Sequence, residues 1–130
     1  MRVTRTLVAV VVLALGALGA LGAANAETTT YECDYPTYSD EKGLHNVKAP
    51  FRLTFLIDSS SKKAYLIGNA GSAELSLIQN SYGLTLVEVT GSGNAMVTAI
   101  TSKGKSVHSR SGIILGDLVP SQYYGQCQRK

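Results

Sequence analysis

Four side chains in the second half of the chain could together bind an anion: His108, Arg110, Tyr123 and Tyr124. If residues 107–110 form a strand, His108 and Arg110 share one face, because side chains alternate along a strand. Arginine offers a fork of N–H donors to a carboxylate or phosphate, and tyrosine rings offer flat amphipathic contact. We expect these four residues to line a ligand site. The alternative is a solvent-facing strand and a tyrosine pair packed on a disulfide.

Other reactive arrangements are poorly supported. No G-x-S-x-G segment occurs, and nothing in the sequence links a serine to His45 or His108. The acidic residues are scattered, and no His, Asp and Glu cluster predicts a metal site. Gly91-Ser92-Gly93 lies between two predicted strands and precedes no helix, so it is not a phosphate loop. We therefore expect neither an enzyme nor a cofactor. A small hydrolase stays an alternative, and it would need one of the histidines hydrogen-bonded to a carboxylate.

The two cysteines, Cys33 and Cys127, predict one disulfide bond. They are the chain's only cysteines, so a single intramolecular pairing is available in an oxidising compartment. Redox-active pairs usually have C-x-x-C spacing, and zinc sites need about four ligands. The two positions are 94 residues apart, and closing a loop of that size contributes roughly 4–5 kcal/mol in the chain-entropy model.

The elements that position these residues are strands, because apolar residues recur with period two. In residues 51–57, for example, Phe51, Leu53, Phe55 and Ile57 share one face. Short turns rich in Gly, Asn, Ser and Lys separate the runs. The predicted strands cover residues 28–35, 51–57, 63–67, 73–79, 84–90, 95–101, 105–110 and 123–128. Residues 35–50 and 113–122 are expected to be irregular connections, either of which has room for a short helical turn.

This pattern predicts an all-β fold, an antiparallel up-and-down meander of about eight strands. Such a sheet closes into a barrel or folds into a sandwich to protect its edges. A bond from Cys33 to Cys127 requires the first and last strands to be neighbours. It therefore favours a closed or nearly closed barrel, with a β-sandwich as the alternative.

The first 26 residues are typical of a cleaved signal peptide. Arg2 and Arg5 precede an apolar run over residues 7–21, and Ala24-Asn25-Ala26 matches the small-x-small cleavage pattern. The run is shorter than the ~20 residues of a membrane-spanning helix, so we expect no membrane anchor after cleavage. The product is expected to be a soluble periplasmic or secreted protein with one domain, residues 27–130.

Removal of Arg2 and Arg5 lowers the formal net charge from +3 to +1. A nucleic-acid-binding protein would show a basic stripe with interleaved aromatic residues. The pairs Lys62-Lys63 and Arg129-Lys130 are isolated, so nucleic acid is not an expected partner.

Two resemblances add to this interpretation. Residues 107–110 and 118–127 resemble a family of small exported bacterial proteins without an assigned activity. Tyr31-Glu32-Cys33, together with Cys127, is similar to the outline of the membrane-bound C-type lysozyme inhibitors, which are small periplasmic eight-stranded barrels. The later serine-glycine-x-x-tyrosine and tryptophan-x-lysine-glycine motifs of that family are missing, so no inhibitory residues carry over.

The expected function is that of an exported, non-enzymatic binding or interaction module with a small ligand or a protein as its partner. A lysozyme-inhibitor-like protein and a small hydrolase are the alternatives. No motif identifies the ligand.

Overall fold

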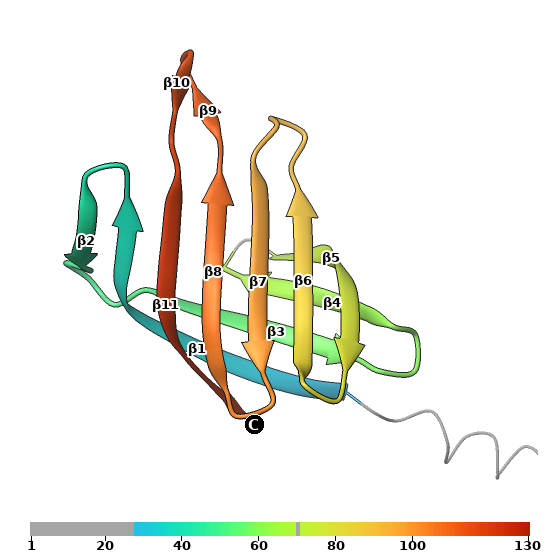
Figure 1. The fold of residues 1–130 in the computed structure, drawn as a ribbon. Helices are drawn as coiled ribbons and strands as arrows, with labels where there is room; N and C mark the ends of the chain where they lie inside the picture. Colours follow the sequence, from blue (N-terminus) through green and yellow to red (C-terminus); the bar gives the residue numbers. More distant parts are fainter. Residues whose placement is uncertain (1–27, 70) are drawn as a thin grey trace, which may run out of the picture.

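The segments in which apolar and polar residues alternate form the wall of a closed antiparallel barrel of eight strands (Figure 1). This computed structural model describes residues 28–69 and 71–130. The barrel strands are β1 (Thr28–Asp40), β3 (Arg52–Asp58), β4 (Lys63–Gly68), β5 (Gly71–Asn80), β6 (Gly83–Val89), β7 (Ala95–Thr101), β8 (Lys105–Ser111) and β11 (Ser121–Arg129). Each pairs with the next in this order, as the predicted meander requires, and β11 returns to pair with β1.

The disulfide bond joins the strands that close the barrel. Cys33 on β1 lies directly opposite Cys127 on β11, with their Cα atoms 3.9 Å apart. The prediction that the first and last strands are neighbours is confirmed, and the fold is a barrel and not a sandwich.

The barrel interior is filled by the inward-facing residues of the alternating pattern. On β3, for example, Phe55 and Ile57 are buried while their neighbours Thr54 and Leu56 are only half-buried. Three polar side chains, Thr98, Ser106 and His108, are also buried. The buried apolar residues are Cys33, Tyr35, Phe55, Ile57, Ala64, Leu75, Leu84, Leu86, Ile100 and Cys127. These side chains fill the interior of the barrel between its two ends.

Strand β1 changes its partner partway along its length. Its first half pairs with β3 through Asp34, and its second half, from Thr37, pairs with β2 (Gly43–Asn46). A β-bulge separates the halves, because three steps on β1 from Asp34 to Thr37 face two steps on β11. Gly125 lies opposite the bulge, where a Cβ atom would collide with the carbonyl oxygen of Asp34. The bulge lets the second half of β1 extend past β3 as a hairpin with β2.

The two stretches that were predicted to be irregular connections, residues 35–50 and 113–122, both contain strands, so that prediction is wrong. Residues 35–46 continue β1 and form β2. Beyond β8, strands β9 (Ile113–Ile114) and β10 (Asp117–Leu118) form a hairpin of their own. The described residues include no helical turn in either stretch.

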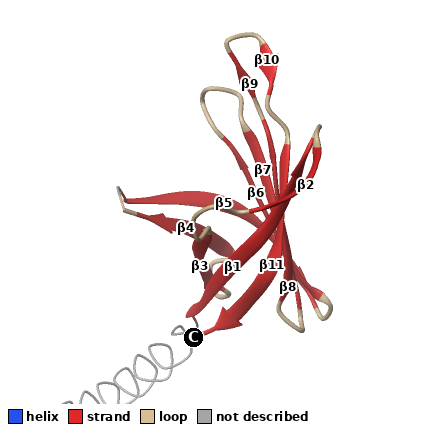
Figure 2. Cartoon of the chain, turned by 90° about the vertical axis from the view of Figure 1, so that its left-hand side faces the viewer, coloured by secondary structure: helices blue, strands red, loops and turns tan. Residues whose placement is uncertain are grey.

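Three hairpins project from one end of the barrel, which we call the mouth. They are the β1–β2, β6–β7 and β9–β10 hairpins, and they lie opposite the end that holds the C-terminus (Figures 1 and 2). Residues 28–69 and 71–130 contain no helix that could span a membrane. The predicted signal peptide, residues 1–26, lies outside the described residues.

Candidate functional site

A row of side chains crosses five strands just below the mouth. Register places each of these residues opposite the next on the neighbouring strand, so all of them point to the same side of the wall. The row consists of Thr98 on β7, His108 on β8, Tyr123 on β11, Tyr38 on β1 and His45 on β2. Its first residues are in the barrel core, and its last lie on the β1–β2 hairpin.

His108 is 1% exposed and carries its proton on Nδ1. Its Nε2 accepts a hydrogen bond of 3.0 Å from Arg110 Nε, which is always a donor. Nδ1 must therefore carry the ring's proton, and it donates to Thr98 Oγ1 at 2.7 Å. Burial, followed by the nearby Arg110 charge, lowers the pKa of His108 from 6.5 to about 4. The ring is neutral at pH 7 and acts as a fixed acceptor for Arg110.

Arg110 is held by its Nε atom and by two aromatic rings. Its guanidinium lies 4.9 Å from the ring centroid of Phe51 and 5.6 Å from that of Tyr123. Among residues 28–69 and 71–130, no carboxylate lies within ion-pair distance of it. Only Nε is used in a hydrogen bond to a described residue. The two terminal nitrogens therefore form an oriented fork with no partner among the residues that the structure describes.

Phe51, Tyr123, Tyr38 and His45 form an aromatic stack that leads from the core to the β1–β2 hairpin. The ring centroids of Phe51 and Tyr123 are 4.3 Å apart. Tyr123 and Tyr38 follow at 5.3 Å, and Tyr38 and His45 at 5.0 Å. Aromatic pairs at such separations contribute roughly 0.5–1.5 kcal/mol beyond area burial. The stack fixes the hairpin against the wall that carries Arg110.

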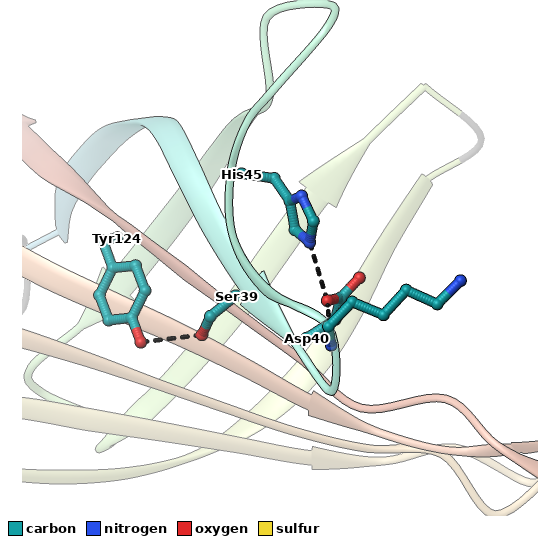
Figure 3. Close-up of polar contacts among 5 residues, drawn as sticks. Ser39, Asp40, His45 and Tyr124 are labelled. Carbon is teal, nitrogen blue, oxygen red and sulfur yellow. Dashed lines mark hydrogen bonds and ion pairs between the residues drawn. The ribbon is translucent and has the colours of Figure 1, made fainter.

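A second contact fixes the turn of the same hairpin. His45 Nε2 donates a hydrogen bond of 2.8 Å to Asp40 Oδ1 (Figure 3). The same oxygen accepts the N–H of Lys42, also at 2.8 Å. These two hydrogen bonds, with that of His45 contributing more, hold the pKa of Asp40 below its usual value. Asp40 is therefore a carboxylate at neutral pH, and its Oδ2 has no partner among the described residues.

A cavity of about 530 Å³ opens between the three hairpins of the mouth. Arg110 lines it from β8, and Asp40 and Glu41 line it from the turn between β1 and β2. Apolar side chains of the β9–β10 hairpin, including Ile114 and Leu118, form another wall. The cavity thus combines a cation, two acids and an apolar surface.

The structure brings three of the four predicted ligand-binding residues together. His108, Arg110 and Tyr123 contact one another, and Arg110 and Tyr123 line the cavity. Tyr124 lies on the outer face, where its hydroxyl accepts a hydrogen bond of 2.9 Å from Ser39 Oγ (Figure 3). Because neighbours on a strand face opposite sides, Tyr123 and Tyr124 do not belong to one site.

The sequence analysis did not place Tyr38, Asp40 or His45 at the ligand site, because all three lie in a stretch expected to be irregular. It considered His45 only as a possible hydrolase residue. Their sequence signal was faint. Tyr38 and Asp40 stand two apart, which is the spacing of one strand face.

The described part of the chain holds no group of three His, Cys, Asp or Glu residues arranged to bind a metal ion. The His45–Asp40 pair is the contact that the hydrolase hypothesis requires. However, in residues 28–69 and 71–130, the His45 ring has no second hydrogen bond, so no hydroxyl nucleophile is in place.

The described residues form a small closed β-barrel, and its mouth cavity is lined by an arginine that makes no ion pair with any of them. No protein-family model, no curated protein and no solved structure matches the chain in sequence or fold comparisons. Both resemblances noted from the sequence therefore stay predictions.

Proposed function

We propose that the chain is an exported, non-enzymatic binding module that holds the anionic group of a small ligand on Arg110. The Cys33–Cys127 disulfide supports a site of action outside the reducing cytoplasm, where such bonds persist.

The observation that carries the proposal is the free fork of Arg110. Arg110 Nε is engaged by a neutral histidine, and two rings support the guanidinium plane. An arginine fixed in this way loses little side-chain freedom when an anion binds, so more of the interaction energy is available for binding. A carboxylate or phosphate can accept two parallel hydrogen bonds from the terminal nitrogens.

Replacement of Arg110 should weaken anion binding at the mouth. We expect phenyl phosphate and benzoate to perturb the NMR signals of Arg110 and Tyr123 in the wild-type protein. Arg110→Gln should weaken binding by about tenfold or more, because a hydrogen bond to a charged group contributes about 1.5–3 kcal/mol. Arg110→Lys should be intermediate, since a lysine keeps the charge and loses the fork.

Arg129→Gln is the matched control for this experiment. Arg129 and Lys103 line a second hollow of about 440 Å³, which could also attract an anion. Binding should be unchanged in Arg129→Gln. Equal binding to Arg110→Gln and the wild type, or none to either, would contradict the proposal.

A hydrolase is the second candidate, and the His45–Asp40 hydrogen bond is the observation that favours it. If the chain is a binding module, hydrolysis of p-nitrophenyl acetate should not exceed the rate in buffer. The variant His45→Gln should give the same rate as the wild type, because no nucleophile is hydrogen-bonded to that ring. A rate well above background that His45→Gln removes would favour the hydrolase.

A further inference from the structure

We infer that the ligand is a single-chain zwitterionic amphiphile: an anion on Arg110, a cation facing Asp40 and Glu41, and an alkyl chain along the β9–β10 hairpin. This inference rests on the proposed function and specifies its ligand. Three features of the mouth carry it.

The first feature is an apolar finger, residues 113–119, which projects past the cavity. Leu115 at its tip is 99% exposed and Leu118 is 79% exposed. Ile113 and Ile114 are also more than half exposed. So many large apolar side chains close together on one hairpin are unusual for a surface that faces only water. An alkyl chain lying on the finger would cover them.

The backbone conformation of Leu115 at the tip is a second unfavourable property, besides its exposure. Leu115 has a φ of 51° and Gly116 a φ of 87°, so both central residues of this tight turn are left-handed. A type I′ turn usually has Asn, Asp or Gly at its first central position. Leucine is unfavourable there both in backbone conformation and in solvation, which indicates that its side chain serves a purpose in the projecting position.

The second feature is continuity between the finger and Arg110. Arg110 is the penultimate residue of β8, and β9 begins three residues after it. The same cavity is lined by Arg110 at its base and by Ile114, Leu118 and Val119 of the finger. A ligand whose anionic group meets the fork therefore has apolar surface within reach of its other end.

The third feature is the separation of opposite charges across the cavity. Arg110 pairs with Ser121 on β11, and Asp40 follows the residue that pairs with Gln122. Arg110 and Asp40 are thus two strands apart, about 10 Å between Cα atoms, on the same face of the wall. They form no ion pair with each other. Glu41 makes no ion pair with a described residue either.

This charge pattern favours a ligand that carries a cation beside its anion over a purely anionic one. Asp40 and Glu41 would repel a lone carboxylate or phosphate bound to Arg110, whereas a ligand that carries a cation next to its anion would satisfy both walls. Glu88 on β6 pairs with Met96, which pairs with Arg110, so a third acid lies two strands from Arg110 on the same face. The cavity lining combines an apolar surface, a cation and two acids, which is complementary to an alkyl chain, a phosphate and an ammonium group.

Dodecylphosphocholine below its critical micelle concentration is a suitable probe, with binding measured by isothermal titration calorimetry. Three related compounds each lack one group of this probe. Phosphocholine has no alkyl chain, dodecyl phosphate has no cation, and dodecyltrimethylammonium has no anion. We expect dodecylphosphocholine to bind at least about tenfold more tightly than each of them, because burial of only two or three methylenes gives that factor for the chain.

Variants of the protein test which residues bind the alkyl chain and which bind the cation of the probe. Leu115→Ser with Leu118→Ser should weaken dodecylphosphocholine binding and leave phosphocholine binding unchanged. Ile78→Ser is the control, because Ile78 is 66% exposed on β5 and does not line this cavity. Asp40→Asn with Glu41→Gln should remove the preference for dodecylphosphocholine over dodecyl phosphate. Circular dichroism melting would show that each variant is folded.

The outcomes separate this inference from the proposed function. If phosphocholine or dodecyl phosphate binds as tightly as dodecylphosphocholine, and Arg110→Gln abolishes that binding, the amphiphile inference fails and the anion site stands. If dodecylphosphocholine binds Arg110→Gln as well as it binds the wild type, both fail. Flotation with phosphatidylcholine vesicles, without binding of the monomeric detergent, would overturn the inference in favour of a membrane-docking finger.

Discussion

Reduction of the Cys33–Cys127 disulfide should lower the free energy of unfolding by about 4–5 kcal/mol, because the bond closes a loop of 94 residues in the unfolded chain. That is a large share of the roughly 5–15 kcal/mol that stabilise a domain of this size. The midpoint of thermal unfolding should fall by about 20 °C. Circular dichroism at low temperature should still show the β-sheet signal, because the strand pairings of the barrel do not depend on the bond.

The control is the double variant Cys33→Ser with Cys127→Ser, which should melt like the reduced protein and be insensitive to reductant. Both cysteines are buried, so the serines add a small further loss from burying hydroxyl groups. A shift of only one or two degrees on reduction would contradict the prediction, and it would mean that the unfolded chain gains little freedom when the bond is broken.

The free energy of unfolding should also fall by about 3 kcal/mol as the pH is lowered from 7 to 4, through His108. Burial and the Arg110 charge place its pKa at about 4 in the folded protein, against 6.5 for the unperturbed group. Between these values the unfolded chain binds a proton that the folded chain does not. Protons therefore favour the unfolded state, and stability is lost across this window.

Urea unfolding at half-unit steps of pH would measure this loss. The variant His108→Gln removes the buried ring and should therefore lose the slope. Lowered pKa values at Asp40 and Asp58 place the contributions of these carboxylates at still lower pH. If His108→Gln proves poorly folded, an NMR titration of the wild-type His108 ring decides the matter. A ring pKa near 6.5 would overturn the prediction.

The barrel could be predicted from the sequence because each of its strands has one buried face. The period-two signal is strong wherever one face meets the core, as at Phe55 and Ile57. The finger could not be predicted this way, since its strands are short and its residues exposed. Its turn also lacks the usual Asn-Gly or Asp-Gly signal, because Leu115 occupies the first central position.

The site was only half predictable for a related reason. His108 and Arg110 are two apart on one strand, so the alternation alone gives their common face. Their relation to Tyr38 and His45 depends on the register between strands, and a bulge in β1 shifts that register. Pro36, at the bulge, reads in sequence as the end of a strand, which concealed the second half of β1.

The order of strands around the barrel also bears on how the chain folds. Five of the pairings that build the wall, from β3–β4 to β7–β8, join strands that directly follow one another and can form as hairpins. Only the β1–β11 pairing brings together segments from opposite ends of the domain. Such a contact is slow to form, because a long loop must close before any hydrogen bond compensates for it. The disulfide lies in this pairing, so the unfolded oxidised chain already holds β1 and β11 together. Refolding of the oxidised chain should therefore be faster than refolding of the reduced chain.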